Sequence, residues 1–241
     1  MRKLIIISSL FFSFYIHATF IPEDTLAKNF NKIVDNIETY PEEEKASNYN
    51  FIGLAFLNGF FIFKQSNGFT STISVKQDPK KAFEFFKKSH ELSNINGSAL
   101  LGMAYSNGIG VNEDLLEAEK ILFPIRSIYT DASSAYGITI HKLLRKGVYS
   151  SDSKEKIGYM IESLEYGAKN DEIIALNSLY QIYSEGTFIS MNKDLANSYR
   201  QRVKEIVDKK NKLWEAIEDA RSKSNSYKSI VKIEEPKGDR R

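Results

Sequence analysis

Four glycines recur at the same place in a repeated pattern, and this recurrence constrains the fold more than any other feature of the chain. They are Gly59, Gly108, Gly147 and Gly186, and the last three are separated by 39 residues each. The clearest copy of the pattern runs from Ser98 to Leu122. A fixed period of this length is typical of helical repeat proteins, in which each unit buries its apolar face only against its neighbours.

The residues before each glycine predict a first helix, helix A, in every unit. Large apolar residues stand seven and three positions before the glycine, so they share one face of a helix. In chain order these pairs are Ile52 and Phe56, Leu101 and Tyr105, Ile140 and Leu144, and Leu179 and Tyr183. The glycine itself stands where a left-handed residue is expected to end the helix.

The residues after each glycine predict a second helix, helix B. Its expected N-caps are Asp78, Asp114, Ser153 and Asn192, whose side-chain oxygens can accept a free backbone N–H at the start of a helix. Four positions further on stand Ala82, Ala118, Ile157 and Ala196. Alanine at this position lets helix B pack closely on helix A, so each unit is expected to be helix A, a loop and helix B.

The second copy resembles the signature of the Sel1-like repeat family, a relative of the tetratricopeptide repeats, through Ala99, Leu101, Gly102, Tyr105, Gly108, Gly110, Val111, Asp114 and Ala118. The other copies keep parts of that signature, and the third has His141 where the family prefers glycine. The resemblance covers residues 48–205. It implies an all-α fold, a right-handed α-solenoid of about four helix-turn-helix repeats.

The N-terminus has the pattern of a secretory signal peptide. Two basic residues precede an apolar run from Leu4 to Ile16, and Ala18 is a small residue at a plausible cleavage site. The pattern predicts a signal peptide over residues 1–18, cleaved after Ala18, and therefore a periplasmic or secreted bacterial protein. The alternative is an uncleaved membrane anchor, because the run extended to Ile21 approaches the length of a membrane span. The chain has no cysteine, which excludes lipoprotein anchoring.

The segments that flank the repeats are predicted to close the two ends of the solenoid. Residues 19–47 are expected to form an N-terminal capping helix and a linker. Residues 206–221, which include Leu213 and Trp214, are expected to fold back as a C-terminal capping helix. Residues 222–241 are polar and charged and are expected to be a tail.

The charge of the chain excludes one class of partner. The formal net charge is +2 at pH 7. Removal of residues 1–18 would remove Arg2 and Lys3 and no acidic residue, so the mature chain would be close to neutral. Nucleic-acid binding requires a basic stripe that neutralises phosphates, and we expect no nucleic-acid partner.

An insertion in the first unit predicts a β-hairpin. Nineteen residues separate Gly59 from Asp78, where the second copy uses six, and Asn67-Gly68 is a favoured two-residue hairpin turn. With that turn the paired residues are Ile62 with Ile73 and Phe60 with Val75. Phe61 and Phe63 lie on the other face, where they are candidate contacts for a partner. The alternative is that both faces pack against helices.

The A helices offer a second candidate surface. Residues nine, five and two before each glycine lie off the packed stripe, where they would line a concave groove. They are Asn50, Leu54 and Leu57; Ala99, Met103 and Ser106; Ile138, Lys142 and Arg145; and Asn177, Gln181 and Ser184. Met103, Lys142, Arg145 and Gln181 are the candidate contacts, and a partner with an acidic group opposite Lys142 and Arg145 would fit. The alternative is that these residues are solvated or pack on the next repeat.

The sequence gives little support for catalysis. The mature chain has only His90 and His141, in different repeats, and no recognisable catalytic motif. We therefore expect no enzyme, no cofactor and no metal site. The resemblance implies a protein-protein interaction module, and Sel1-like repeats occur in immunity proteins that neutralise antibacterial secretion-system effectors in the periplasm. The alternative is an envelope scaffold or adaptor that binds cell-wall material or a membrane complex.

Overall fold

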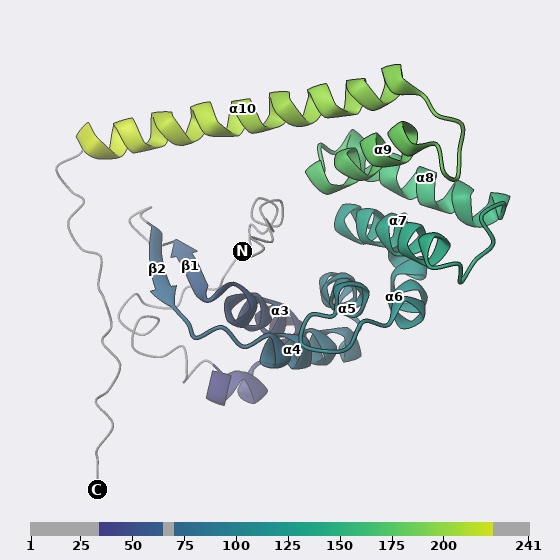
Figure 1. Ribbon diagram of the computed structural model, residues 1–241. Coiled ribbons are helices and arrows are strands. Elements are labelled where there is room, and N and C mark those ends of the chain that lie inside the picture. The colour runs from purple at the N-terminus through teal and green to yellow at the C-terminus, as the bar shows by residue number, and fades with distance from the viewer. Residues whose placement is uncertain (1–33, 65–69, 224–241) are drawn as a thin grey trace, which may run out of the picture. The chain divides into compact units, whose positions relative to one another are not determined.

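The computed structural model describes residues 34–64 and 70–223 of the 241-residue chain, with side chains at 61–73 and beyond 216 left out of the description. The described part consists mainly of consecutive helices (Figure 1). They are α3 (Glu42–Asn58), α4 (Pro79–Glu91), α5 (Ile95–Asn107), α6 (Leu115–Leu122), α7 (Thr130–Arg145), α8 (Lys154–Lys169), α9 (Ile173–Glu185) and α10 (Lys193–Lys223). Short 3-10 helices span Ile37–Thr39 (η1) and Phe123–Ile125 (η2).

These helices pack as neighbours along the chain. Within each unit helix A packs on helix B, as α3 on α4, α5 on α6 and α7 on α8. Each helix B also contacts the next helix A, and the A helices contact one another in the order α3, α5, α7, α9. This nearest-neighbour packing is that of an all-α solenoid. Residues 204–223 of α10 belong to a second compact unit and are described separately below.

The helix caps confirm most of the local predictions. Left-handed Gly59, Gly108 and Gly186 follow α3, α5 and α9 directly, and left-handed Gly147 comes one residue after the C-cap of α7. Three predicted N-caps accept a backbone N–H: Asp78 from Lys81 (3.1 Å), Asp114 from Glu117 (3.0 Å) and Asn192 from Leu195 (3.0 Å). Ser153 is the N-cap residue of α8, as predicted, but its side chain makes no cap hydrogen bond.

A backbone hydrogen bond recurs across the loops of three units. The N-cap N–H donates to the carbonyl oxygen three residues before the glycine: Asp78 to Phe56 (2.9 Å), Asp114 to Tyr105 (2.9 Å) and Asn192 to Tyr183 (3.0 Å). In the α7–α8 loop the N–H of Ser153 donates instead to Ser150 (3.1 Å). The third helix pair therefore departs from the common geometry.

The cause of this departure is an extra turn in both α7 and α8. In three pairs a glycine of helix A packs so tightly on helix B that an added Cβ would lie within 2.6 Å of the facing side chain. The three pairs, each a glycine and the side chain that it faces, are Gly53 with Phe86, Gly102 with Leu122, and Gly137 with Leu164. The predicted alignment placed His141 at this position in the third copy. It is wrong by four residues, because Gly137 lies ten residues before Gly147, whereas Gly53 and Gly102 lie six residues before Gly59 and Gly108.

The insertion after α3 contains strands β1 (Phe60–Lys64) and β2 (Thr70–Ser74), which pair antiparallel. The observed partners are Phe60 with Ser74, Phe61 with Ile73 and Ile62 with Thr72. The predicted register is therefore wrong by one residue, because Ile73 pairs with Phe61 and not with Ile62. The N–H of Val75 donates to the carbonyl oxygen of Gly59 (2.9 Å), so the end of α3 already holds this register. The predicted turn at Asn67-Gly68 lies outside the described residues.

The two ends of the repeat region differ from each other. At the N-terminal end, buried Ile37 packs with Tyr49, Ile52 and Phe86, and Val34 lies against the same cluster. At the other end, α10 continues through residues 206–221 without a break, so these residues do not form a separate helix that folds back. The predicted signal peptide, 1–18, lies outside the described residues. No helix of the described residues is long and apolar enough to span a bilayer.

Candidate functional site

One row of side chains, here called the A-helix row, occupies equivalent positions on four consecutive A helices. Each member directly follows, in sequence, the residue of helix A that packs on helix B. In the first three units that residue is Gly53, Gly102 or Gly137. In the fourth unit it is Tyr180, whose ring lies 5.8 Å from the guanidinium of Arg200 in α10. The row consists of Leu54, Met103, Ile138 and Gln181. Leu54, Met103 and Ile138 are partly exposed, and Gln181 is exposed.

The A-helix row corrects the predicted groove at two points. Because of the extra turn of α7, the residue of the third unit that is equivalent to Met103 is Ile138, not Lys142. Asn50, Ala99 and Ser106, which were expected in the groove, are instead buried. Met103 and Gln181 keep their predicted positions. Phe61 and Phe63 lie on β1, but their side chains are outside the described part.

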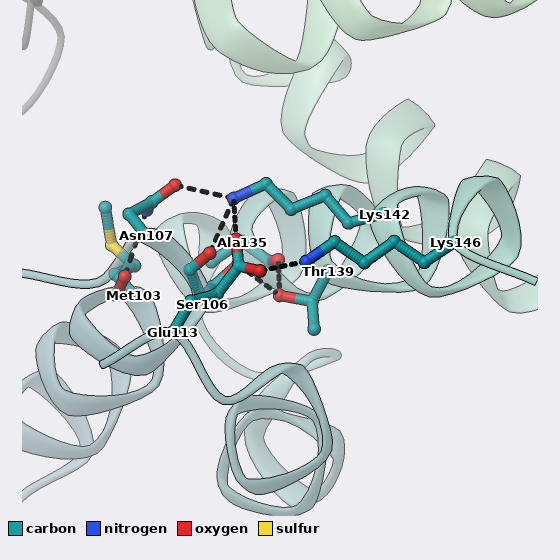
Figure 2. A network of polar contacts seen from close by, with 8 residues as sticks. All are labelled: Met103, Ser106, Asn107, Glu113, Ala135, Thr139, Lys142 and Lys146. Carbon is teal, nitrogen blue, oxygen red and sulfur yellow. Dashed lines mark hydrogen bonds and ion pairs between the residues drawn. The ribbon is translucent and has the colours of Figure 1, made fainter. Parts of the chain in front are cut away.

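Lys142 extends from the extra turn of α7 to the C-terminal end of α5 (Figure 2). Its ammonium group donates to the carbonyl oxygen of Ser106 (2.5 Å) and to Oδ1 of Asn107 (2.9 Å), and it lies 3.8 Å from a carboxylate oxygen of Glu113. Asn107 in turn donates to the carbonyl oxygen of Met103 (2.9 Å). Lys142 thus satisfies the carbonyl group of Ser106 at the end of α5, as a cation near a helix C-terminus does.

Glu113 pairs with both lysines of this cluster, Lys142 and Lys146. It accepts a hydrogen bond from Lys146, which lowers the pKa of the Glu113 carboxyl group against the opposing effect of burial. Burial lowers the pKa of Lys142, while the charge of Glu113 raises it. The hydroxyl group of Thr139 lies within hydrogen-bond distance of two acceptors. They are Oγ of Ser106 (3.0 Å) and the carbonyl oxygen of Ala135 (2.7 Å). The network ties α5 to α7.

A second polar link ties α7 to α9. The guanidinium of Arg145 pairs with Glu185 at 3.3 Å, and the amide of Gln181 donates to the other carboxylate oxygen of Glu185 at 2.7 Å. The structure therefore brings Arg145 and Gln181 together, as it does Met103 and Lys142 through Asn107. Both cations face carboxylates of the same chain. Lys142 and Lys146 share Glu113, and Arg145 pairs with Glu185, so these side chains carry three positive and two negative charges. An acidic partner group opposite Lys142 and Arg145 stays a prediction.

We predict that Lys142→Met lowers the free energy of unfolding by about 1 kcal/mol, because the Ser106 carbonyl oxygen loses its charged donor. Methionine keeps most of the apolar stem, so the change isolates the ammonium group. Urea unfolding measures the effect. Lys146→Met, at a more exposed position, is the control and should cost less. A Lys142→Met protein as stable as the wild type would contradict this structural role.

A buried ion pair that the sequence pattern did not indicate joins α6 to α8. Glu119 is 8% exposed and accepts hydrogen bonds from Tyr149 and from Lys156 Nζ (2.7 Å). Burial opposes the charge on Lys156, but the hydrogen bond and charge of Glu119 raise the Lys156 pKa overall. Burial and the bond to Glu119 raise the pKa of Tyr149. No sequence signal could find this cluster, because its members lie on different repeats.

Tyr136, in α7, is fully buried, and its hydroxyl group has no hydrogen-bond partner among the described residues. Burial raises its pKa, and the charge of Glu119 raises it further. Above pH 10 the unfolded chain ionises its tyrosines while the folded protein keeps Tyr136 neutral, so stability is lost as pH rises.

We predict that Tyr136→Phe leaves stability at pH 7 unchanged or raises it by up to about 1 kcal/mol, because it removes an unpaired buried hydroxyl group. It should also flatten the loss of stability above pH 10. Denaturant unfolding at pH 7 and across the alkaline range checks both effects. Tyr166→Phe, at an exposed position, is the control and should change neither. A marked loss of stability in Tyr136→Phe at pH 7 would contradict the prediction.

The histidines lie in packed surroundings. His141 is buried with its ring edge against Phe188 (5.7 Å between centroids), and burial lowers its pKa. Nδ1 of His90 lies 2.8 Å from the hydroxyl group of Ser98. Within residues 34–64 and 70–223, no group of three or more His, Asp or Glu side chains is placed to hold a metal ion.

No family model matches the chain, and no curated protein matches it. Two similar solved structures are c5321, a protective antigen of uropathogenic Escherichia coli that displays an SLR fold, and a Sel1 repeat protein from Oxalobacter formigenes. The first is 16% identical with a TM-score of 0.49, over 71% of this chain and 33% of that chain. The second is 20% identical with a TM-score of 0.47, over 73% of this chain and 67% of that chain.

Both structures are of the Sel1-repeat class that the sequence resembles. This chain spans about a third of the length of the Escherichia coli antigen. At these identities the likeness concerns the fold alone. The solenoid architecture of this chain rests on its own helix packing and on its recurring caps.

Proposed function

We propose that the chain is a protein-interaction module, an exported solenoid of about four right-handed Sel1-like repeats, whose partner docks along the A-helix row. Two observations on the A helices carry the proposal: most side chains of α5 and α7 are buried, and polar side-chain contacts join successive A helices. The packing of α5 and α7 leaves mainly the row and its polar neighbours open to a partner. Side-chain bonds from Lys142 and Arg145 hold successive A helices together. A surface that is already ordered loses little conformational entropy on binding.

The chemistry of the row describes the partner segment. Leu54, Met103 and Ile138 offer apolar contacts, and Gln181 offers a polar one. The neighbouring cations Lys142, Lys146 and Arg145 pair with Glu113 and Glu185, which leaves one positive charge in excess. The row therefore suits an amphipathic helix or extended segment that has one apolar side, flanked by an acidic group.

The more specific form of the proposal is a periplasmic immunity protein that covers an antibacterial effector. Its support is the resemblance to Sel1-like repeats together with the signal-peptide pattern of residues 1–18. The strands β1 and β2 provide the competing surface, since they directly follow α3, the helix that carries Leu54. An envelope scaffold that binds cell-wall material is the alternative outcome.

The test is affinity capture from native periplasm with the tagged protein that lacks residues 1–18. A matched variant replaces residues 60–75 by a short loop. Recovery of one protein by both forms supports the A-helix row, whereas its loss with the variant would assign binding to the hairpin. Inhibition of the recovered protein's toxic activity supports the immunity role. Sedimentation with purified cell wall and recovery of no protein would instead favour the scaffold.

A further inference from the structure

The second half of α10 carries a stripe of residues with coiled-coil spacing. The helix is described to Lys223, and residues spaced alternately by three and four positions are mostly apolar. They are Val203, Ile206, Lys210, Leu213, Ile217 and Ala220. Such spacing keeps one seam of a helix facing a partner helix over several turns.

The stripe is the continuation of the seam that packs α10 in the repeat region. Four and seven residues before Val203, Tyr199 stacks on Tyr183 of α9 (6.0 Å between centroids) and Ala196 is buried. In the second unit, Leu213 is 52% exposed, and Val207 and Trp214 beside it are 38% and 59% exposed. Helices in proteins gain most of their stability from packing of an apolar face against another element, so these exposed residues call for a covering helix.

We propose that residues 203–220 of α10 pair with the same segment of a second copy of this chain in an antiparallel two-stranded coiled coil. The position of Lys210 decides the direction. A parallel pair aligns like positions, so it would place two Lys210 side chains opposite each other in the seam. An antiparallel pair centred between residues 211 and 212 places Lys210 opposite Leu213 of the second copy. The lysine stem then packs on leucine while its ammonium group reaches water.

The flanking positions agree with the same register. On one side of the seam, Val207 faces Trp214 of the second copy, and Trp214 faces Val207. On the other side, Lys209 faces Ala216 of the second copy, so its charge meets no like charge there. The antiparallel register thus covers the exposed apolar residues Val207, Leu213 and Trp214 together.

The pairing has a consequence for binding. Each copy contributes one repeat domain to the dimer. The dimer would present two A-helix rows and bind a repetitive or dimeric partner with avidity. The pairing itself does not depend on the proposed function and stands or fails separately.

Sedimentation equilibrium of the purified protein over a wide range of concentrations tests the pairing. We expect a monomer-dimer equilibrium. Val207→Glu with Trp214→Glu should abolish the dimer, because it puts four carboxylates beside the seam. Ile128→Glu with Val148→Glu makes the same chemical change at exposed positions outside α10 and should leave the dimer intact. A protein that is monomeric at all concentrations, or equal behaviour of the two double variants, would overturn the proposal.

Cysteine cross-linking tests the direction, because the natural chain has no cysteine. In the antiparallel register, residue 206 of one copy lies opposite residue 217 of the other. Ile206→Cys combined with Ile217→Cys should therefore give a covalent dimer on oxidation, whereas Ile206→Cys alone should not. Efficient cross-linking of the Ile206→Cys single variant would show parallel pairing and overturn the proposed register.

Discussion

Replacement of Gly110 by alanine is expected to lower the free energy of unfolding by about 3 kcal/mol, with a corresponding fall in the urea midpoint. Gly110 lies in the α5–α6 loop with a φ of +71°, a conformation that side chains disfavour. A Cβ at this position would lie 2.0 Å from the carbonyl oxygen of Pro79 and 2.6 Å from its carbonyl carbon. Both atoms belong to the backbone at the start of α4, so relief requires the loop to move.

Gly147→Ala is the matched control for this prediction. Gly147 has nearly the same backbone conformation (φ +69°), but a Cβ there would meet no atom within 4 Å. Its replacement should cost only the backbone strain, about 1 kcal/mol. Equal losses in the two variants would contradict the close packing of the α5–α6 loop on α4.

Glu119→Ala is expected to lower the free energy of unfolding by about 3 kcal/mol, as measured by urea unfolding at pH 7. The substitution leaves Lys156, whose side chain is 24% exposed, without its carboxylate partner and removes the acceptor of Tyr149. Loss of one member of a buried ion pair is costly because the other charge stays buried. The pKa values of Lys156 and Tyr149 are raised in the folded protein. The contribution of these contacts to the stability of the wild-type protein is therefore full at neutral pH and is lost as pH rises above about 10.

Glu117→Ala in the same helix is the control for Glu119→Ala. Glu117 pairs with Lys120 at the surface (3.3 Å), where the lysine side chain is 76% exposed. An exposed pair of this kind contributes little, so we expect a loss below about 1 kcal/mol. A Glu119→Ala protein no less stable than Glu117→Ala would contradict the role of Glu119 in joining α6 to α8.

Features that depend on adjacent residues could be predicted from the sequence. A left-handed glycine such as Gly108 and an N-cap such as Asp114 act within one turn of their own helix. The extra turns of the third pair could not be predicted, because they do not disturb the period. Each 39-residue interval between glycines contains one of the two helices with an extra turn, α7 in the first and α8 in the second. Only the packing of Gly137 on Leu164 reveals the shift.

The candidate site was predicted in part for the same reason. Met103 and Gln181 belong to regular units, so their distance from the glycine placed them correctly. Lys142 lies in the extra turn, and its partners on α5 are 35 and 36 residues away in sequence. Its pairing with them depends on the A helices lying side by side, which residue types alone do not specify.

The most direct test of the A-helix row is the affinity of the captured partner for two variants of the tagged protein. Met103→Glu introduces a carboxylate at the centre of the row. Leu116→Glu makes the equivalent change at an exposed apolar residue of α6. We expect Met103→Glu to weaken binding by about tenfold or more and Leu116→Glu to leave the dissociation constant unchanged. Equal affinity of both variants, or a larger loss with Leu116→Glu, would contradict docking along the A-helix row.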